Sequence, residues 1–183
     1  MPAMKQWFAL SAIGRDRPGI VADLSQLIYE CDCNLEDSSM TVLGTEFAVL
    51  LLLSGQGEDV RERLAAACKR LEWEKRLTVF FRPLESDPAG VPRETDHARY
   101  VLHATGLDKA GIVARVSRCL ADHGISIRQM ETQSRPEPES GAPFYTMRIE
   151  MDVPGGVDEG LLRERLDAIG RELYVDVAVE RSR

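Results

Sequence analysis

The segment GRDRPGIVADLS at residues 14–25 returns 92 residues later as GLDKAGIVARVS at residues 106–117. Seven of the twelve positions are identical, including the aspartate, the second glycine and the Ile-Val-Ala that follows it. In each copy a polar turn separates an apolar, strand-like stretch from a segment with the apolar spacing of a helix. Such a turn presents the free backbone N–H groups of a helix start. The repeat therefore predicts two related copies of one ligand-facing loop.

The length and charge of the chain limit its architecture and its partners. The chain has 183 residues, and a repeat spacing of 92 residues predicts two modules. We expect them at residues 1–83 and 99–183, joined by an exposed linker at residues 84–98. The formal net charge of −7 argues against a nucleic-acid partner, for which a basic face is expected. No segment resembles a signal peptide or a membrane span, so we expect a cytoplasmic protein with no membrane partner.

The apolar spacing predicts the same order in both modules: strand, helix, two strands, helix, strand. The expected strands are 7–14, 34–42, 47–53 and 73–82, then 100–106, 125–134, 144–153 and 174–180; the expected helices are 20–31, 60–71, 112–123 and 158–172. Residues 135–143 contain too many prolines and charges to continue a strand, so we expect them to form a surface loop.

The cysteines and histidines show no catalytic or metal-binding pattern. The cysteines form no Cys-x-x-Cys pair, and we expect all of them to be buried, reduced thiols. They are Cys31, Cys33, Cys68 and Cys119. His97 in the linker, His103 in a strand and His123 at a helix end share no spacing with a nucleophile or carboxylate. We therefore expect no catalytic residue, no metal site and no cofactor.

The loop of the first module carries the groups that a small zwitterion needs. The N–H groups of Gly19, Ile20 and Val21 are expected at a helix start, where an anion gains about 0.3–1 kcal/mol from the helix dipole. Either the carboxylate of Asp16 or a carbonyl at the end of the preceding strand is expected to accept an ammonium group. Asn34, which both donates and accepts, is expected to begin the next strand close to this loop.

An ordinary helix start is the alternative interpretation of this loop. Asp16 would then cap the helix, Pro18 would preset φ and Gly19 would allow a close backbone. The second copy weighs against this alternative, because capping does not require the shared Gly-Ile-Val. That copy has lost the proline, and Ser126 stands where the first has Asn34, so we expect the two sites to differ in affinity.

The loop 16–21, with Asn34-Leu35 after the helix, resembles the ACT domain, a small regulatory module that binds amino acids. Two such modules without an attached enzyme or DNA-binding domain resemble the glycine cleavage system transcriptional repressor group. The resemblance implies an α+β fold of two ferredoxin-like (βαββαβ) modules whose antiparallel sheets pack side by side, with ligand at the interface between the modules.

The resemblance also implies which residues bind the ligand. One site would face the strand around residues 129–132 and the other the strand around residues 37–40. The implied ligand-binding residues are Asp16, Arg17, Pro18, Gly19, Ile20, Val21, Asn34, Leu35, Asp108, Gly111, Ile112, Val113, Ser126, Gln129 and Met130.

We therefore expect an amino-acid-sensing protein, without enzymatic activity, that affects transcription by binding another regulatory protein and not nucleic acid directly. Glycine is one candidate ligand, and a homodimer through free sheet edges is an open alternative to a monomer. A scaffold that has lost its ligand is the first competing interpretation. An acylphosphatase-like enzyme would use Arg17 and Asn34. A ferredoxin-like RNA binder would use Phe47, Phe80 and Phe81, against the net charge.

Overall fold

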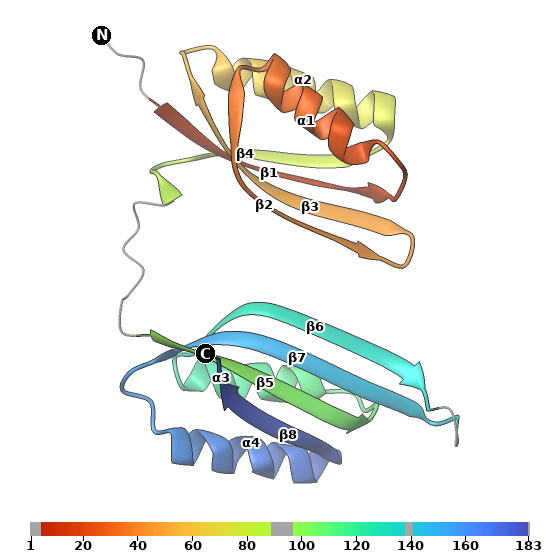
Figure 1. Ribbon diagram of the computed structural model, residues 1–183, viewed down its shortest axis with the longest axis vertical. Helices are drawn as coiled ribbons and strands as arrows, with labels where there is room; N and C mark the ends of the chain where they lie inside the picture. The colour runs from red at the N-terminus through yellow and green to blue at the C-terminus, as the bar shows by residue number, and fades with distance from the viewer. Residues whose placement is uncertain (1–4, 89–96, 138–140, 183) are drawn as a thin grey trace. The chain divides into compact units, whose positions relative to one another are not determined.

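The computed structural model describes residues 5–88, 97–137 and 141–182. The chain divides into two compact units, residues 1–92 (module 1) and 93–183 (module 2), and each is described by itself. In Figure 1 both helices of each module cover one face of its sheet. No helix in the described part of the chain is long and apolar enough to cross a membrane.

Module 1 has the predicted order of elements. They are β1 (Lys5–Arg15), α1 (Ile20–Glu30), β2 (Cys33–Leu43), β3 (Glu46–Gln56), α2 (Val60–Lys75) and β4 (Thr78–Leu84). The strands form one sheet in the order β2-β3-β1-β4, and every neighbouring pair is antiparallel. Alternate residues of β1, including Phe8 and Leu10, are fully buried, because one face of the sheet packs on the helices.

Module 2 repeats this architecture, which confirms the predicted pair of ferredoxin-like folds. Its elements are β5 (His97–Leu107), α3 (Ile112–Asp122), β6 (Ser126–Pro136), β7 (Pro143–Pro154), α4 (Glu159–Leu173) and β8 (Val175–Arg181). The strand order is β6-β7-β5-β8, again antiparallel throughout. Each module buries its own apolar cluster, and the two clusters share no residue. The expected packing of the two sheets side by side stays a prediction.

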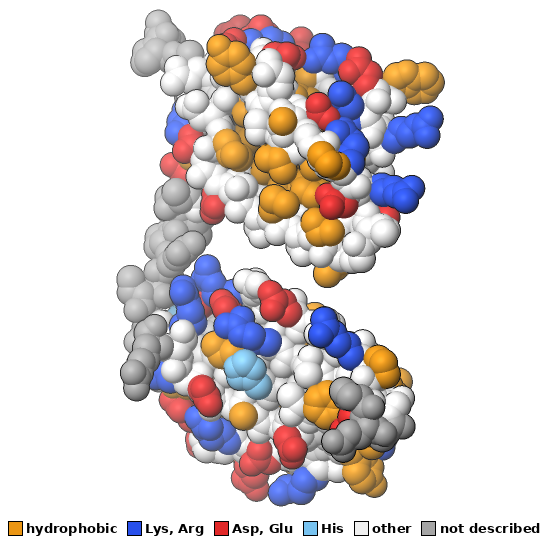
Figure 2. All heavy atoms as spheres, turned by 45° about the vertical axis from the view of Figure 1, so that its right-hand side comes forward, with side chains coloured by type: hydrophobic (Ala, Val, Ile, Leu, Met, Phe, Trp, Pro, Cys, Tyr) orange, Lys and Arg blue, Asp and Glu red, His pale blue; other side chains and the backbone are white. Residues whose placement is uncertain are grey.

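The uncovered faces of the two sheets differ in chemistry. In module 1, Leu50 and Phe80 flank Ser11 across the sheet and are 58% and 65% exposed. Figure 2 shows more hydrophobic side chains on the visible face of module 1 than on that of module 2. In module 2, the strand equivalent to β3 carries Arg148 and Glu150, which form an ion pair at 2.7 Å. The repeat thus preserved the fold while the outer faces diverged.

Several boundaries predicted from the sequence are wrong. Helix α2 continues to Lys75, so the strand predicted from Trp73 begins later, at Thr78; Trp73 is apolar but 87% exposed. Strands β4 and β5 extend into the predicted linker and place His97 in a strand, while residues 89–96 of that linker lie outside the described part.

The predicted loop at residues 135–143 is also shorter than expected. Pro136 pairs with Pro143 at the end of the β6–β7 hairpin, and residues 138–140 lie outside the described part. Pro136 is tolerated because β6 is an edge strand, and Pro143 is tolerated because it is the first residue of β7.

Candidate ligand-binding loops

The loop between β1 and α1 ends in an open helix start. Gly19 is the N-cap residue, with φ of 87° in the left-handed region, and no side chain caps the helix. Within the described residues, the N–H groups of Ile20 and Val21 have no hydrogen-bond acceptor. Ile20 is 2% exposed and anchors the helix in the core, whereas Val21 is 49% exposed. The helix start is therefore firmly held and open to an acceptor from outside the chain.

The neighbouring hairpin holds this loop in place. The backbone N–H of Asp16 donates to the carbonyl oxygen of Thr45 at 2.8 Å, in the turn between β2 and β3. Asp16 itself is exposed, and its carboxylate does not cap α1. The alternative interpretation, an ordinary helix start, expected Asp16 to cap α1, and this expectation is wrong.

Arg17 lies beside the N-cap residue Gly19 and pairs along the first turn of α1. Its guanidinium donates to a carboxylate oxygen of Asp23 at 2.5 Å and to the carbonyl of Pro18 at 3.2 Å. Lys75 at the end of α2 lies 3.3 Å from the other carboxylate oxygen of Asp23. The hydrogen bond from Arg17 is the main cause that lowers the pKa of Asp23; burial opposes it, and the contacts of Lys75 lower the pKa further.

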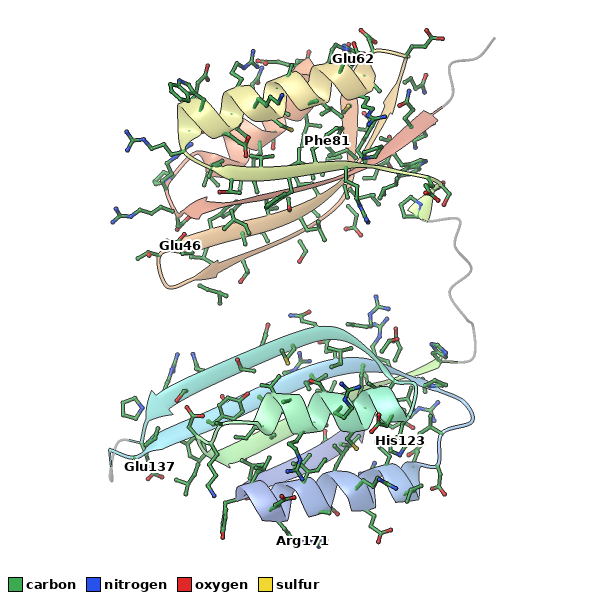
Figure 3. The ribbon with its side chains drawn as sticks, turned by 180° about the vertical axis from the view of Figure 1, so that it is seen from behind. Glu46, Glu62, Phe81, His123, Glu137 and Arg171 are labelled. Carbon is green, nitrogen blue, oxygen red and sulfur yellow. The ribbon has the colours of Figure 1, made fainter. Side chains whose placement is uncertain are left out.

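This cluster predicts a specific pH dependence of stability for module 1. Because the pKa of Asp23 is lowered in the folded state, its stabilising contribution is present above the unfolded pKa of about 3.9 and is lost as pH falls through the folded value. Asp23→Asn should therefore reduce stability near neutral pH and flatten its decline in acid. Urea unfolding at a series of pH values measures both effects. Glu62→Gln, on the exposed surface of α2 (Figure 3), is the control and should keep the parent profile.

The loop between β5 and α3 repeats the open helix start. Gly111 is the N-cap residue with φ of 97°, and no side chain caps α3. The N–H of Asp108 donates to the carbonyl of Pro143 at 3.0 Å, matching the bond of Asp16 in module 1. Ile112 is 1% exposed, so this helix start is anchored in the same way, with Val113 next to it partly buried.

Two residues near this second loop were missed by the sequence reasoning. The hydroxyl of Ser134 donates to the carboxylate of Asp108 at 2.6 Å, so this acid is already engaged within the module. Tyr145 pairs with Gly106 at the end of β5 and occupies the position of Phe47 in module 1. Burial raises the pKa of Tyr145, and the Asp108 carboxylate adds to that shift. Comparing the two repeats in the sequence could have found this residue, because tyrosine in module 2 replaces the phenylalanine of module 1.

The expected convergence of Asn34 on its own loop is wrong. Asn34 pairs with Ser54, which pairs with Trp7 on β1, whereas the loop follows Arg15 at the other end of that strand. Trp7 and Arg15 are eight residues apart on β1, which corresponds to about 26 Å at 3.3 Å per residue. The reason is that α1 runs back along the sheet, so β2 begins where β1 began. Leu35 shares this placement.

Ser126 of module 2 is displaced in the same way. It pairs with Asp152, which pairs with Arg99 near the start of β5, far from the loop that follows Leu107. The other two strand residues implied by the resemblance, Gln129 and Met130, lie in the middle of the edge strand β6 and are exposed. Ligand binding at the interface between the modules, and by these strand residues, stays a prediction.

The expected state of the cysteines is confirmed. All four are free and buried, and burial raises the pKa of Cys33 to about 11 and that of Cys68 to about 12. These thiols are therefore poor nucleophiles. In the described ranges, no three His, Cys, Asp or Glu side chains gather in a way that could hold a metal ion.

Comparison with known proteins identifies the module. A family model for the ACT domain matches residues 6–82, which include all six elements of module 1 except the outer ends of β1 and β4. Module 1 is an ACT domain. Since module 2 repeats the fold and the loop motif, the chain is a tandem ACT-domain protein.

Similar proteins extend the match beyond one ACT module. The glycine cleavage system transcriptional repressor of Escherichia coli (strain K12) is 27% identical over 175 residues, covering 92% of this chain and 86% of the relative. The UPF0237 protein MK1213 of Methanopyrus kandleri is 42% identical over 67 residues, covering 34% of this chain and 74% of the relative. A solved structure of an unknown protein from Galdieria sulphuraria has a TM-score of 0.78 at 28% identity and covers 98% of this chain and 100% of its own.

Proposed function

We propose that this tandem ACT protein senses a free amino acid, for which glycine is the first candidate, and regulates transcription by binding another regulatory protein. The observation that carries the proposal is the pair of open helix starts at Gly19 and Gly111, each with N–H groups that meet no acceptor in the described residues. The similarity to a glycine cleavage system transcriptional repressor over nearly the whole chain supports the regulatory role.

The chemistry of the loops suits an α-amino acid. A carboxylate placed at the start of α1 would accept hydrogen bonds from Ile20 and Val21 and gain from the helix dipole. Asp16, exposed beside this helix start, offers a carboxylate to the ammonium group. Helix α4 shows what an occupied start looks like, because there Asp158 accepts a hydrogen bond from the N–H of Leu161 at 3.0 Å.

The two loops should bind with different affinity. In module 2, Ser134 already donates to Asp108, so an ammonium group competes with this hydroxyl for the carboxylate. In module 1 the carboxylate of Asp16 has no such partner among the described residues. We propose that the loop of module 1 is the tighter site.

Calorimetric titration of the intact protein with a panel of amino acids tests this proposal. Gly19→Ala adds a Cβ to a residue with φ of 87° and should strain the turn by about 1–2 kcal/mol. If the turn shifts to relieve that strain, the N–H groups are misplaced and affinity falls roughly five- to thirtyfold. Gly111→Ala should affect only the weaker site.

The matched control is Gly57→Ala. Gly57 also has positive φ, at 114°, and lies just before α2, at the end of the module 1 sheet opposite to the β1–α1 loop. Its substitution should cost stability without changing affinity. If no amino acid binds the parent protein, or if the control weakens binding as much as Gly19→Ala, the sensing role is refuted and a ligand-free scaffold is the better account.

The geometry argues against both an acylphosphatase-like enzyme and an RNA-binding sheet. An acylphosphatase-like site needs Arg17 and Asn34 together, but Arg17 pairs with Asp23 and Asn34 lies at the opposite end of the sheet. An RNA-binding sheet needs exposed aromatic side chains. Phe47 is 1% exposed, and the ring of Phe81 stacks on that of Phe8 with centroids 5.4 Å apart. Of the three candidate phenylalanines, Phe80 alone is left on the open face.

A further inference from the structure

Each module has a groove between its two helices, and the repeat makes the two grooves directly comparable. The groove between α1 and α2 has a volume of about 390 Å³, and that between α3 and α4 about 400 Å³. The first helices align through the 92-residue repeat. The second helices align at their C-caps, Arg76 and Tyr174, which are both left-handed. The two grooves are therefore lined by equivalent positions with different side chains.

Ion pairs close the groove of module 1. Arg70 on α2 lies 2.9 Å from a carboxylate oxygen of Glu30 on α1, and Lys75 on α2 bonds to Asp23 on α1. With Glu74, this groove is lined by three carboxylates and two cations. Both cations are paired with carboxylates of the groove, and the net charge of its lining is negative. This groove is therefore not suited to bind an anion.

The groove of module 2 has the opposite balance. Arg115, Arg118 and Arg165 line it, at the positions that Asp23, Gln26 and Ala67 hold in module 1. The two carboxylates in the lining, Asp122 and Glu172, leave this groove with one net positive charge, although the whole chain carries −7. A local excess of guanidinium groups in an acidic chain favours a bound anion.

Two of these guanidinium groups are free. Arg115 reaches across the groove and donates to Glu172 at 3.0 Å, so this pair is self-contained. Arg118 on α3 and Arg165 on α4 have neither an ion pair nor a hydrogen bond with any residue in the described part of the chain. They line the same groove from opposite helices, and both are exposed.

Cys119 forms the floor of the groove in module 2, and His123 lies at one end of it. Cys119, 7% exposed, lies beneath these arginines, and burial raises the pKa of its thiol while Arg165 opposes that shift. His123 (labelled in Figure 3) follows the last turn of α3, where its Nδ1 lies 2.7 Å from the carbonyl of Cys119. That contact fixes the ring and leaves Nε2 without a hydrogen bond to any described residue of the module.

We propose that the groove between α3 and α4 binds a small phosphate-bearing anion, held between Arg118 and Arg165. The planar donor fork of arginine matches a phosphate, and two forks from facing helices can clamp one group. A groove of this volume is large enough for a small phosphate monoester. This groove shares no lining residue with the amino-acid loops, so the proposal does not depend on the function proposed for them.

Amide NMR of the intact protein, titrated with inorganic phosphate and with phenyl phosphate at constant ionic strength, tests this proposal. Saturable shifts are expected in α3 and α4, with tighter binding of the monoester if the groove takes an organic phosphate. Arg118→Gln and Arg165→Gln should each weaken binding by about tenfold, because each removes one charged hydrogen-bonding fork.

Arg70→Gln in the equivalent groove of module 1 is the matched control and should leave these affinities unchanged. All three arginines lie on helix surfaces, so thermal unfolding should show that each variant is folded. The proposal is overturned if the parent protein shows no saturable shifts in α3 and α4. It is also overturned if Arg70→Gln weakens binding equally, or if succinate binds more tightly than both phosphate compounds.

Discussion

Leu120→Ala is expected to lower the free energy of unfolding of module 2 by about 2–5 kcal/mol and to leave module 1 unchanged. Leu120 lies on α3, is completely buried and belongs to the apolar cluster of module 2. Alanine removes the buried atoms and leaves a cavity that the surrounding sheet and helix can fill only in part. The effect should stay within one module because the two clusters share no residue.

The distribution of tryptophan provides a clean measurement. Both tryptophans of the chain, Trp7 and Trp73, lie in module 1. Tryptophan fluorescence in a denaturant titration therefore reports module 1, whereas far-UV circular dichroism reports both. Leu120→Ala should shift part of the dichroism transition and leave the fluorescence midpoint in place. Leu64→Ala, equally buried in module 1, is the matched variant and should move the fluorescence midpoint. A fluorescence shift in Leu120→Ala would mean that the modules unfold as one unit.

Gly170→Ala should destabilise module 2 by about 1–3 kcal/mol, although alanine is normally the better helix former. Gly170 lies in the last turn of α4 and is buried. A Cβ at this position would stand 2.6 Å from the carbonyl oxygen of Val175 and 3.3 Å from a methyl group of Val177. The closer contact is backbone at the start of β8, so it cannot be relieved by rotating a side chain. The helix and the strand would have to separate.

Gly160→Ala in the same helix is the control. Gly160 lies in the first turn of α4, where an added Cβ would meet only the carboxylate of Asp158, at 3.2 Å. A shift of a few tenths of an ångström relieves this contact and keeps the N-cap hydrogen bond from Leu161, so the change in stability should stay within about 0.5 kcal/mol. Thermal unfolding of both variants, followed by circular dichroism, measures the contrast. Equal stability of Gly170→Ala and the parent would show that α4 and β8 are not packed as closely as the structure describes.

Much of the local structure could be predicted from the sequence, because it depends on neighbours along the chain. Helix α1 was expected from the spacing of Ile20, Leu24 and Leu27, and all three are buried in the observed helix. The open turn was expected from Gly19, whose positive φ suits glycine. Where apolar spacing was ambiguous the prediction failed, as at Trp73, since an exposed tryptophan on a helix looks like a strand residue in the sequence.

The sequence by itself determined the two modules, their order of elements and the glycine-opened helix starts. Apolar periodicity and turn residues act over a few positions, and the repeat shows that the same local signals occur twice. Only the tertiary structure decided which side chains meet. It separated Asn34 from its loop, because α1 returns the chain to the other end of the sheet. It brought Ser134 to Asp108 and placed Arg118 and Arg165 in one groove, because strand register and helix packing join residues far apart in sequence. Contacts of that kind depend on how the elements pack, which local spacing does not specify.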